Sequence, residues 1–103
     1  MPHLIIESSI DIPQKAVEDL HITVGRQESI SLSSVKTRIY TPIVSYTGEG
    51  QNSDFVCLTL KLLAGRSEQL KNQIATNLLA KAKEHIKNSI LTVEVIELGV
   101  YKK

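Results

Sequence analysis

The segment that decides the fold covers residues 55–62 and reads Phe55-Val56-Cys57-Leu58-Thr59-Leu60-Lys61-Leu62. It is β-rich at its start and apolar at nearly every position, which predicts a strand. Because side chains alternate along a strand, Phe55 and Cys57 share one side, while Val56, Leu58 and Leu60 share the other. Apolar residues therefore occur on both faces, and such a strand needs cover on both sides.

The residues that follow predict a turn, a helix and a further strand. Residues 64–67 leave the strand, with Ser67 as a good N-cap for the helix. The helix is indicated by apolar residues at steps of four: Leu70, Ile74, Leu78, Ala82 and Ile86. We expect it to end around residues 88–89. Residues 91–98 alternate as a last strand, and residues 101–103 form a short solvated tail.

The first half of the chain repeats this order. Residues 4–7 predict a buried strand, and a helix is expected from Pro13 into the 20s, capped by Asp11 and weakening near Gly25. Residues 35–40 alternate cleanly, which predicts a strand whose one side carries two cations and a phenol: Lys36, Arg38 and Tyr40. Residues 47–54 are rich in turn formers.

The predicted fold is a single α+β domain over residues 1–103, made of two β-α-β halves at about 2–46 and 54–98. Right-handed crossovers in both halves put both helices on one face of a four-stranded mixed sheet. The opposite face is left bare although it carries apolar residues. The simplest cover is another copy of the chain, so we expect an oligomer whose sheets pack inward.

Composition narrows the possible partners and location. The chain has 12 basic and 11 acidic residues and a net charge of +1, which argues against nucleic acid or an acidic membrane as a partner. Cys57 is the only cysteine, which excludes an internal disulfide and suits a reducing compartment. With no signal segment and no apolar run near the ~20 residues of a membrane span, we expect a cytoplasmic protein.

Pro2 is the first candidate for chemistry. A small residue after the initiator favours removal of Met1, and Pro2 then carries a secondary amine held in a ring at the start of a strand. A general base is well mounted in this way, because the scaffold aims it and nearby cations disfavour its protonation. The alternative is that the Met-Pro start has no catalytic role, and if Met1 is retained the Pro2 nitrogen is an amide without basicity.

Three cations are candidates for binding an anion: Lys36, Arg38 and Arg66. The first two share one side of a strand, and Arg66 precedes the N-terminus of the second helix, where backbone donors and the dipole favour negative charge. The planar arginine fork suits a carboxylate. The alternative for each residue is a solvated surface charge. The three histidines, His3, His21 and His85, lack metal-ligand spacing, and we expect structural or surface roles for them.

Three stretches of the sequence resemble the 5-carboxymethyl-2-hydroxymuconate isomerase family of the tautomerase superfamily. Residues 2–7, Pro-His-Leu-Ile-Ile-Glu, resemble the family's Pro-His-Phe-Ile-Val-Glu start. Residues 35–39 are similar to its Ile-Arg-Ser-Arg-Val strand. Residues 58–67 are similar to its Met-Thr-Leu-Lys-Ile-Gly-Ala-Gly-Arg-Ser segment, with Arg66 in place.

The resemblance implies a homotrimer with the fold of 4-oxalocrotonate tautomerase and macrophage migration inhibitory factor. It implies that Pro2 shuttles a proton along a small unsaturated 2-hydroxy or 2-keto carboxylate, while Arg38 and Arg66 bind the carboxylate or polarise the enol oxygen. It implies no metal or organic cofactor. Lys36 stands where the family has the first arginine of its pair, which keeps the charge but loses the bidentate geometry.

Two alternatives remain open at this stage. One is a tautomerase for a different enol, such as a phenylpyruvate-like compound. The other is an inactive trimeric binding module that has kept the fold.

Overall fold

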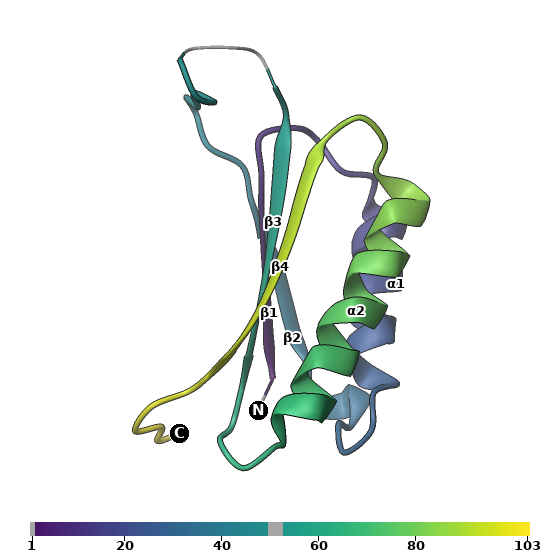
Figure 1. Ribbon diagram of the computed structural model, residues 1–103, viewed down its shortest axis with the longest axis vertical. Helices are drawn as coiled ribbons and strands as arrows, with labels where there is room; N and C mark the ends of the chain where they lie inside the picture. Colours follow the sequence, from purple (N-terminus) through teal and green to yellow (C-terminus); the bar gives the residue numbers. More distant parts are fainter. Residues whose placement is uncertain (1, 50–52) are drawn as a thin grey trace.

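The computed structural model describes residues 2–49 and 53–103, which form one sheet with two helices packed against it (Figure 1). Met1 and the middle of the predicted 47–54 loop lie outside the described residues. The elements in chain order are β1 (His3–Ser8), α1 (Gln14–Gly25), the short 3-10 helix η1 (Leu32–Ser34), β2 (Lys36–Tyr40), β3 (Phe55–Leu62), α2 (Glu68–His85) and β4 (Ile90–Glu97).

The sheet has the strand order β2-β1-β3-β4. β1 is parallel to β2, β3 is parallel to β4, and the central pair β1 and β3 is antiparallel. Each parallel pair is joined through one helix, and Figure 1 shows α1 and α2 side by side on the same face of the sheet. The predicted α+β fold, a four-stranded mixed sheet with two helices on one face, is confirmed.

The core lies between the helices and this face of the sheet. In β3, every second residue is buried, beginning with Val56, so the two sides predicted from the sequence are confirmed. Leu4 and Ile6 of β1 are fully buried beside them, and Ile74 and Leu78 of α2 cover them from above. Their burial removes the side chains from water and supplies the main stabilisation of the fold.

Of the two predicted helix caps, one is confirmed and one is wrong. Ser67 caps α2 as predicted, since its hydroxyl oxygen accepts a hydrogen bond of 3.1 Å from the backbone N–H of Leu70. Asp11 does not cap α1. The N-cap residue is Pro13, whose ψ of 142° is extended and which makes no side-chain cap. α2 ends at His85 rather than at 88–89, and β4 begins one residue earlier than predicted.

Gly25, the last residue of α1, allows a close approach that places β2. A Cβ atom at this position would lie 2.9 Å from the Cα atom of Leu32 in η1. Real side chains do not tolerate such a distance, so only glycine lets the chain fold back tightly here. The turn through η1 then leads directly into Val35 and β2.

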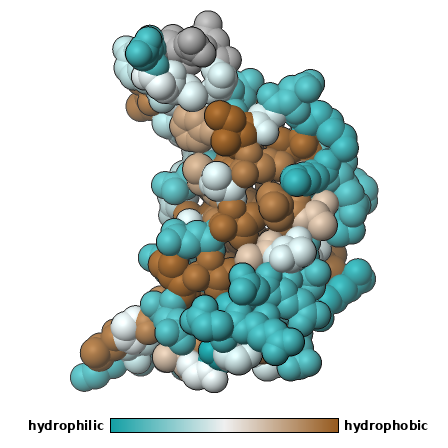
Figure 2. Space-filling model, in the orientation of Figure 1, coloured by the Kyte–Doolittle hydropathy of each residue, from teal (hydrophilic) through white to brown (hydrophobic). Residues whose placement is uncertain are grey.

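The face of the sheet away from the helices is called the open face. It carries alternate residues of each strand, beginning with His3 in β1, Lys36 in β2, Phe55 in β3 and Ile90 in β4. Two segments project beyond it: the arm (residues 41–49 and 53–54) at one end of the sheet and the tail (residues 98–103) at the other. Figure 1 shows both on the side away from the helices, and Figure 2 shows the outline hollowed between them. None of the helices in the described ranges is long and apolar enough to cross a membrane.

Candidate functional site

Pro2 lies at the end of the sheet where β1 and β2 begin. It is buried, and its carbonyl oxygen accepts a hydrogen bond of 3.0 Å from the backbone N–H of Lys36. This bond extends the parallel pairing of the two strands by one residue. The backbone of Pro2 is therefore held by the sheet, which fixes the direction of its ring.

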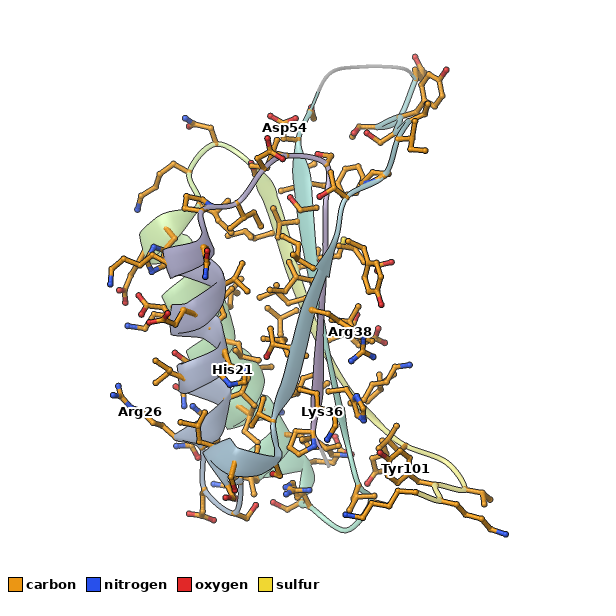
Figure 3. All side chains as sticks on the ribbon, turned by 180° about the vertical axis from the view of Figure 1, so that it is seen from behind. His21, Arg26, Lys36, Arg38, Asp54 and Tyr101 are labelled. Carbon is orange, nitrogen blue, oxygen red and sulfur yellow. The ribbon has the colours of Figure 1, made fainter. Side chains whose placement is uncertain are left out.

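Lys36 and Arg38 stand on the open face next to this end of β1. In the register of the two strands, Lys36 pairs with His3 and Arg38 pairs with Ile5. Figure 3 shows both cations on the side of the sheet away from α1, the helix that carries His21. The strand alternation predicted from the sequence thus places these two cations on the same face, on the strand that pairs with β1 next to Pro2.

His3 connects this cationic group to the end of the chain. Arg38 Nη1 lies 3.2 Å from Nδ1 of His3, and the Tyr101 hydroxyl lies 3.3 Å from Nε2 of the same ring. The rings of His3 and Tyr101 meet edge to face, with centroids 6.1 Å apart. Partial burial lowers the pKa of His3 below its ordinary value of 6.5, and the charge of Arg38 acts in the same direction, with weaker contributions from Lys36, the amino terminus and Lys61.

Arg66 lies in the turn between β3 and α2, at the same end of the sheet as Pro2. Its guanidinium group is used within the chain: Nε donates to the Ser29 hydroxyl at 3.0 Å, and Nη2 donates to the Ser29 carbonyl oxygen at 3.1 Å. Nη1 also donates to the carbonyl oxygen of Leu63 at 3.3 Å. Ser29 has a φ of 68°, in the left-handed region that residues other than glycine rarely adopt. Arg66 therefore ties the loop after α1 to the turn before α2.

A large hollow lies at the opposite end of the sheet. It is a groove of about 500 Å³ between the arm and the open face, and its lining includes Glu7, Tyr40, Val44, Tyr46, Phe55 and Cys57. No Lys, Arg or His is among the described residues that line it. A substrate carboxylate would meet the negative charge of Glu7 and no positive charge in this groove, so we place the candidate site at the Pro2 end, where Lys36 and Arg38 lie.

Two members of this site were missed from the sequence, namely His3 as a partner of Arg38 and Tyr101 as a partner of His3. The alternation of β1 puts His3 on the side opposite Leu4, and this was the available signal for its place on the open face. Nothing local indicates the contact with Tyr101, which is 98 positions away in the chain. Over residues 2–49 and 53–103, no group of three or more His, Cys, Asp or Glu residues could hold a metal ion.

Comparison with known proteins agrees with this architecture. Residues 2–100 match the family model of 5-carboxymethyl-2-hydroxymuconate isomerase. Among curated proteins no sequence matches the chain significantly.

Solved structures show the same fold at low identity. A 5-carboxymethyl-2-hydroxymuconate isomerase from Deinococcus radiodurans R1 is 24% identical with a TM-score of 0.83, over 99% of this chain and 88% of that one. A 5-carboxymethyl-2-hydroxymuconate delta-isomerase is 17% identical with a TM-score of 0.86, over 100% and 87% of the two chains. A fused 4-OT protein described as a symmetric trimer is 15% identical with a TM-score of 0.76, over 94% and 87%.

The family match covers almost the whole chain, including Pro2 and the cationic strand, and the structural matches extend over the same sheet and helices. The resemblance seen in the sequence is thus confirmed. The chain belongs to the 5-carboxymethyl-2-hydroxymuconate isomerase family, and it is an isomerase with the tautomerase fold.

Proposed function

We propose that the protein moves a proton in a small unsaturated 2-hydroxy or 2-keto carboxylate such as 5-carboxymethyl-2-hydroxymuconate. Pro2, after removal of Met1, acts as the general acid and base. The observation that carries this proposal is the burial of Pro2 at the start of β1, directly beside the strand that bears Lys36 and Arg38.

The chemistry follows from this placement. The two cations disfavour the protonated amine, so the nitrogen of Pro2 is available as a base near neutral pH. It takes the proton from the 2-hydroxyl group or from an allylic carbon of the substrate. It returns the same proton to a carbon further along the conjugated system, so that the product is an isomer and no other reactant is consumed.

The substrate is held by charge. Arg38 binds a carboxylate or the developing enolate oxygen on the open face, and Lys36 adds a second positive charge two residues earlier on the same side of β2. Arg66 contributes from the turn before α2, where a helix N-terminus adds favourable backbone dipoles. In this scheme Arg66 has to share its guanidinium group between the substrate and Ser29.

The working unit is a homotrimer in which the open faces pack inward. Apolar side chains are exposed on the arm and the tail. Relative to a fully exposed reference residue, the accessible area is 102% for Ile43, 79% for Tyr46 and 96% for Val100. Figure 2 shows brown apolar surface gathered beside the teal surface of the helices. Association with other copies would remove this apolar surface from water and so stabilise the assembly. A solved structure with the same fold is described as a symmetric trimer.

A second candidate substrate is an enol with a single carboxylate, such as phenylenolpyruvate. It is favoured by two observations: Lys36 lacks the arginine fork, and the nitrogen donors of Arg66 already bind Ser29 and Leu63. Because fewer guanidinium groups are free to bind carboxylates in pairs of hydrogen bonds, a substrate with several carboxylates gains less binding energy over one with a single carboxylate.

An ultraviolet assay decides between these substrates. Protein whose intact mass shows loss of Met1 is mixed with 5-carboxymethyl-2-hydroxymuconate, 2-hydroxymuconate or phenylenolpyruvate, and kcat/KM is compared. The highest value with the first compound supports the proposal, and the highest value with the third supports the second candidate. Failure to turn over any of the three, with Pro2 verified as the first residue, would overturn the proposed function.

A further inference from the structure

The side chain of His3 sits between Arg38 and Tyr101 and has a defined protonation state. Arginine is always charged and only donates, so the Arg38 Nη1 group 3.2 Å away requires Nδ1 of His3 to accept. The ring is then neutral and carries its proton on Nε2. That proton is directed to the Tyr101 hydroxyl oxygen at 3.3 Å, which leaves the tyrosine hydroxyl hydrogen free for another acceptor.

The surroundings of His3 favour this neutral state. Lys36 pairs with His3 from β2, and Lys61 pairs with it from β3, so cations flank the ring on both neighbouring strands. Arg38 approaches the ring from β2, and Tyr101 approaches it from the tail. Protonation of His3 would add a fourth positive charge to those of Lys36, Lys61 and Arg38, and it would turn Nδ1 from an acceptor into a donor facing Arg38.

His3 is also the acceptor that orients Arg38. Within the described part of the chain, Nδ1 of His3 is the one side-chain or backbone acceptor that the Arg38 guanidinium group contacts. A long side chain with one fixed donor loses much of its freedom, while its remaining N–H groups stay available to a ligand. The ring of His3 is in turn held edge to face by Tyr101, whose neighbours Val100 and Lys102 are exposed.

We propose that His3 is a positioning residue: its neutral imidazole holds Arg38 in the orientation that binds the substrate carboxylate, and Tyr101 of the tail holds the imidazole. This inference rests on the proposed function in one respect, namely that Arg38 binds the carboxylate. The tail then has a role at the site, because the contact of Tyr101 with His3 helps to fix the orientation of the Arg38 guanidinium group.

The kinetic test is a double-mutant cycle between His3 and Arg38. His3→Leu removes the acceptor and should raise KM about tenfold with a smaller change in kcat, the size expected for loss of one charge-assisted hydrogen bond. In the Arg38→Ala background, His3→Leu should add nothing further. His3→Asn restores an acceptor near the position of Nδ1 and should recover most of the KM, while Tyr101→Phe should raise KM less than His3→Leu does.

His85→Asn is the matched control, because it changes a hydrogen-bonded histidine that joins the two helices and lies away from the site. It should leave KM unchanged. If Arg38→Ala raises KM but His3→Leu does not, the positioning role is wrong while the proposed function stands. If Arg38→Ala itself leaves KM unchanged, the carboxylate role of Arg38 in the proposed function is wrong.

A second measurement needs no turnover. Nitrogen-15 NMR of the imidazole groups should show His3 as the Nε2–H tautomer, and the signal is identified by its loss in His3→Asn. Its pKa should lie below 6.5 and should rise in Arg38→Ala, because removal of a neighbouring cation favours the protonated ring. An Nδ1–H tautomer, or a pKa that does not respond to Arg38→Ala, would overturn the inference even for protein with no measurable activity.

Discussion

The backbone N–H of Lys36 donates a hydrogen bond of 3.0 Å to the carbonyl oxygen of Pro2, so the proposed base and the proposed anion-binding strand are joined directly. A base fixed in this way does not need to be brought into place by substrate. The backbone of Pro2 is held beside the strand that carries Lys36 and Arg38, and general base catalysis requires a base positioned in this way.

Replacing Pro2 by alanine should therefore lower kcat/KM by about two to four orders of magnitude, the usual contribution of a positioned general base. Alanine is also small, so Met1 should still be removed, and intact mass verifies this for each sample. Pro13→Ala makes the same chemical change at the N-cap of α1, away from the site, and should leave kcat/KM unchanged. Full activity in Pro2→Ala with a free N-terminus would remove Pro2 from the mechanism.

Arg66→Ala should change both kinetics and stability. Loss of substrate contacts in the ground and transition states should raise KM and lower kcat together. Loss of the hydrogen bonds to Ser29 and Leu63 should lower the free energy of unfolding by about 1 kcal/mol, since these bonds are exposed to solvent. Steady-state kinetics and urea unfolding at one fixed protein concentration measure the two effects.

Ser29→Gly separates the two roles of Arg66. Glycine accepts the positive φ of 68° without strain and removes only the hydroxyl acceptor, while the carbonyl oxygen at residue 29 remains. It should lower stability less than Arg66→Ala and leave kcat close to that of the unchanged protein. A lower stability in Arg66→Ala with unchanged kcat and KM would make Arg66 a structural residue and not a substrate ligand.

Ile43→Asp should dissociate the proposed trimer. Ile43 is fully exposed on the arm of a single chain, and an aspartate placed there would carry an unpaired charge into an interface between copies. Sedimentation equilibrium should give three times the 11.4 kDa mass of one chain for the unchanged protein and a smaller mass for the variant. Gln73→Asp, which adds the same charge on the exposed side of α2, should remain trimeric. A trimer that persists in Ile43→Asp at micromolar concentration would show that the arm is not part of the interface.

Cys57 offers a chemical check on the same assembly. It lies on the open face and is only partly buried in a single chain. If the open faces pack inward, a maleimide should label it slowly in the native protein and faster in Ile43→Asp. Fast labelling of the unchanged protein would argue that the open face is not covered.

The contact between Asp19 and His85 should make stability depend on pH in the acid range. Asp19 Oδ2 lies 2.7 Å from His85 Nε2 and joins α1 to α2. The hydrogen bond from His85 holds the pKa of Asp19 below its ordinary value of 3.8, against the opposing effect of partial burial. A carboxyl group with a lowered pKa stabilises the fold above its unfolded pKa, and this stabilisation is lost as pH falls through the folded pKa.

Asp19→Asn should therefore be less stable than the unchanged protein at pH 7, and the difference should shrink as the pH is lowered toward 3 and below. Urea unfolding at several pH values measures this. Glu18→Gln alters the neighbouring exposed carboxylate of α1, which makes no side-chain hydrogen bond within residues 2–49 and 53–103, and should have little effect. An equal loss of stability at every pH would mean that Asp19 acts through packing and not through its charge.

Most of the fold was predictable from local pattern. The alternation in residues 55–62 and 35–40 assigned the two faces of β3 and β2 correctly, and steps of four placed the buried side of α2. The capping of α1 was predicted wrongly, because Pro13 has an extended ψ and its own carbonyl oxygen accepts the first hydrogen bonds of the helix, from Ala16 and Val17. Asp11 then lies too far from the helix start to serve as its cap.

The sequence by itself determined the strands, the helices, the faces they bury and the family, because these depend on residue type and on spacing within one element. Only the tertiary structure decided that His3 accepts from Arg38, that Tyr101 of the tail reaches His3, and that Arg66 turns back to Ser29. These partners lie 35, 98 and 37 positions apart. Such contacts depend on strand register and on the path of the turns, and no local periodicity encodes where two distant side chains meet.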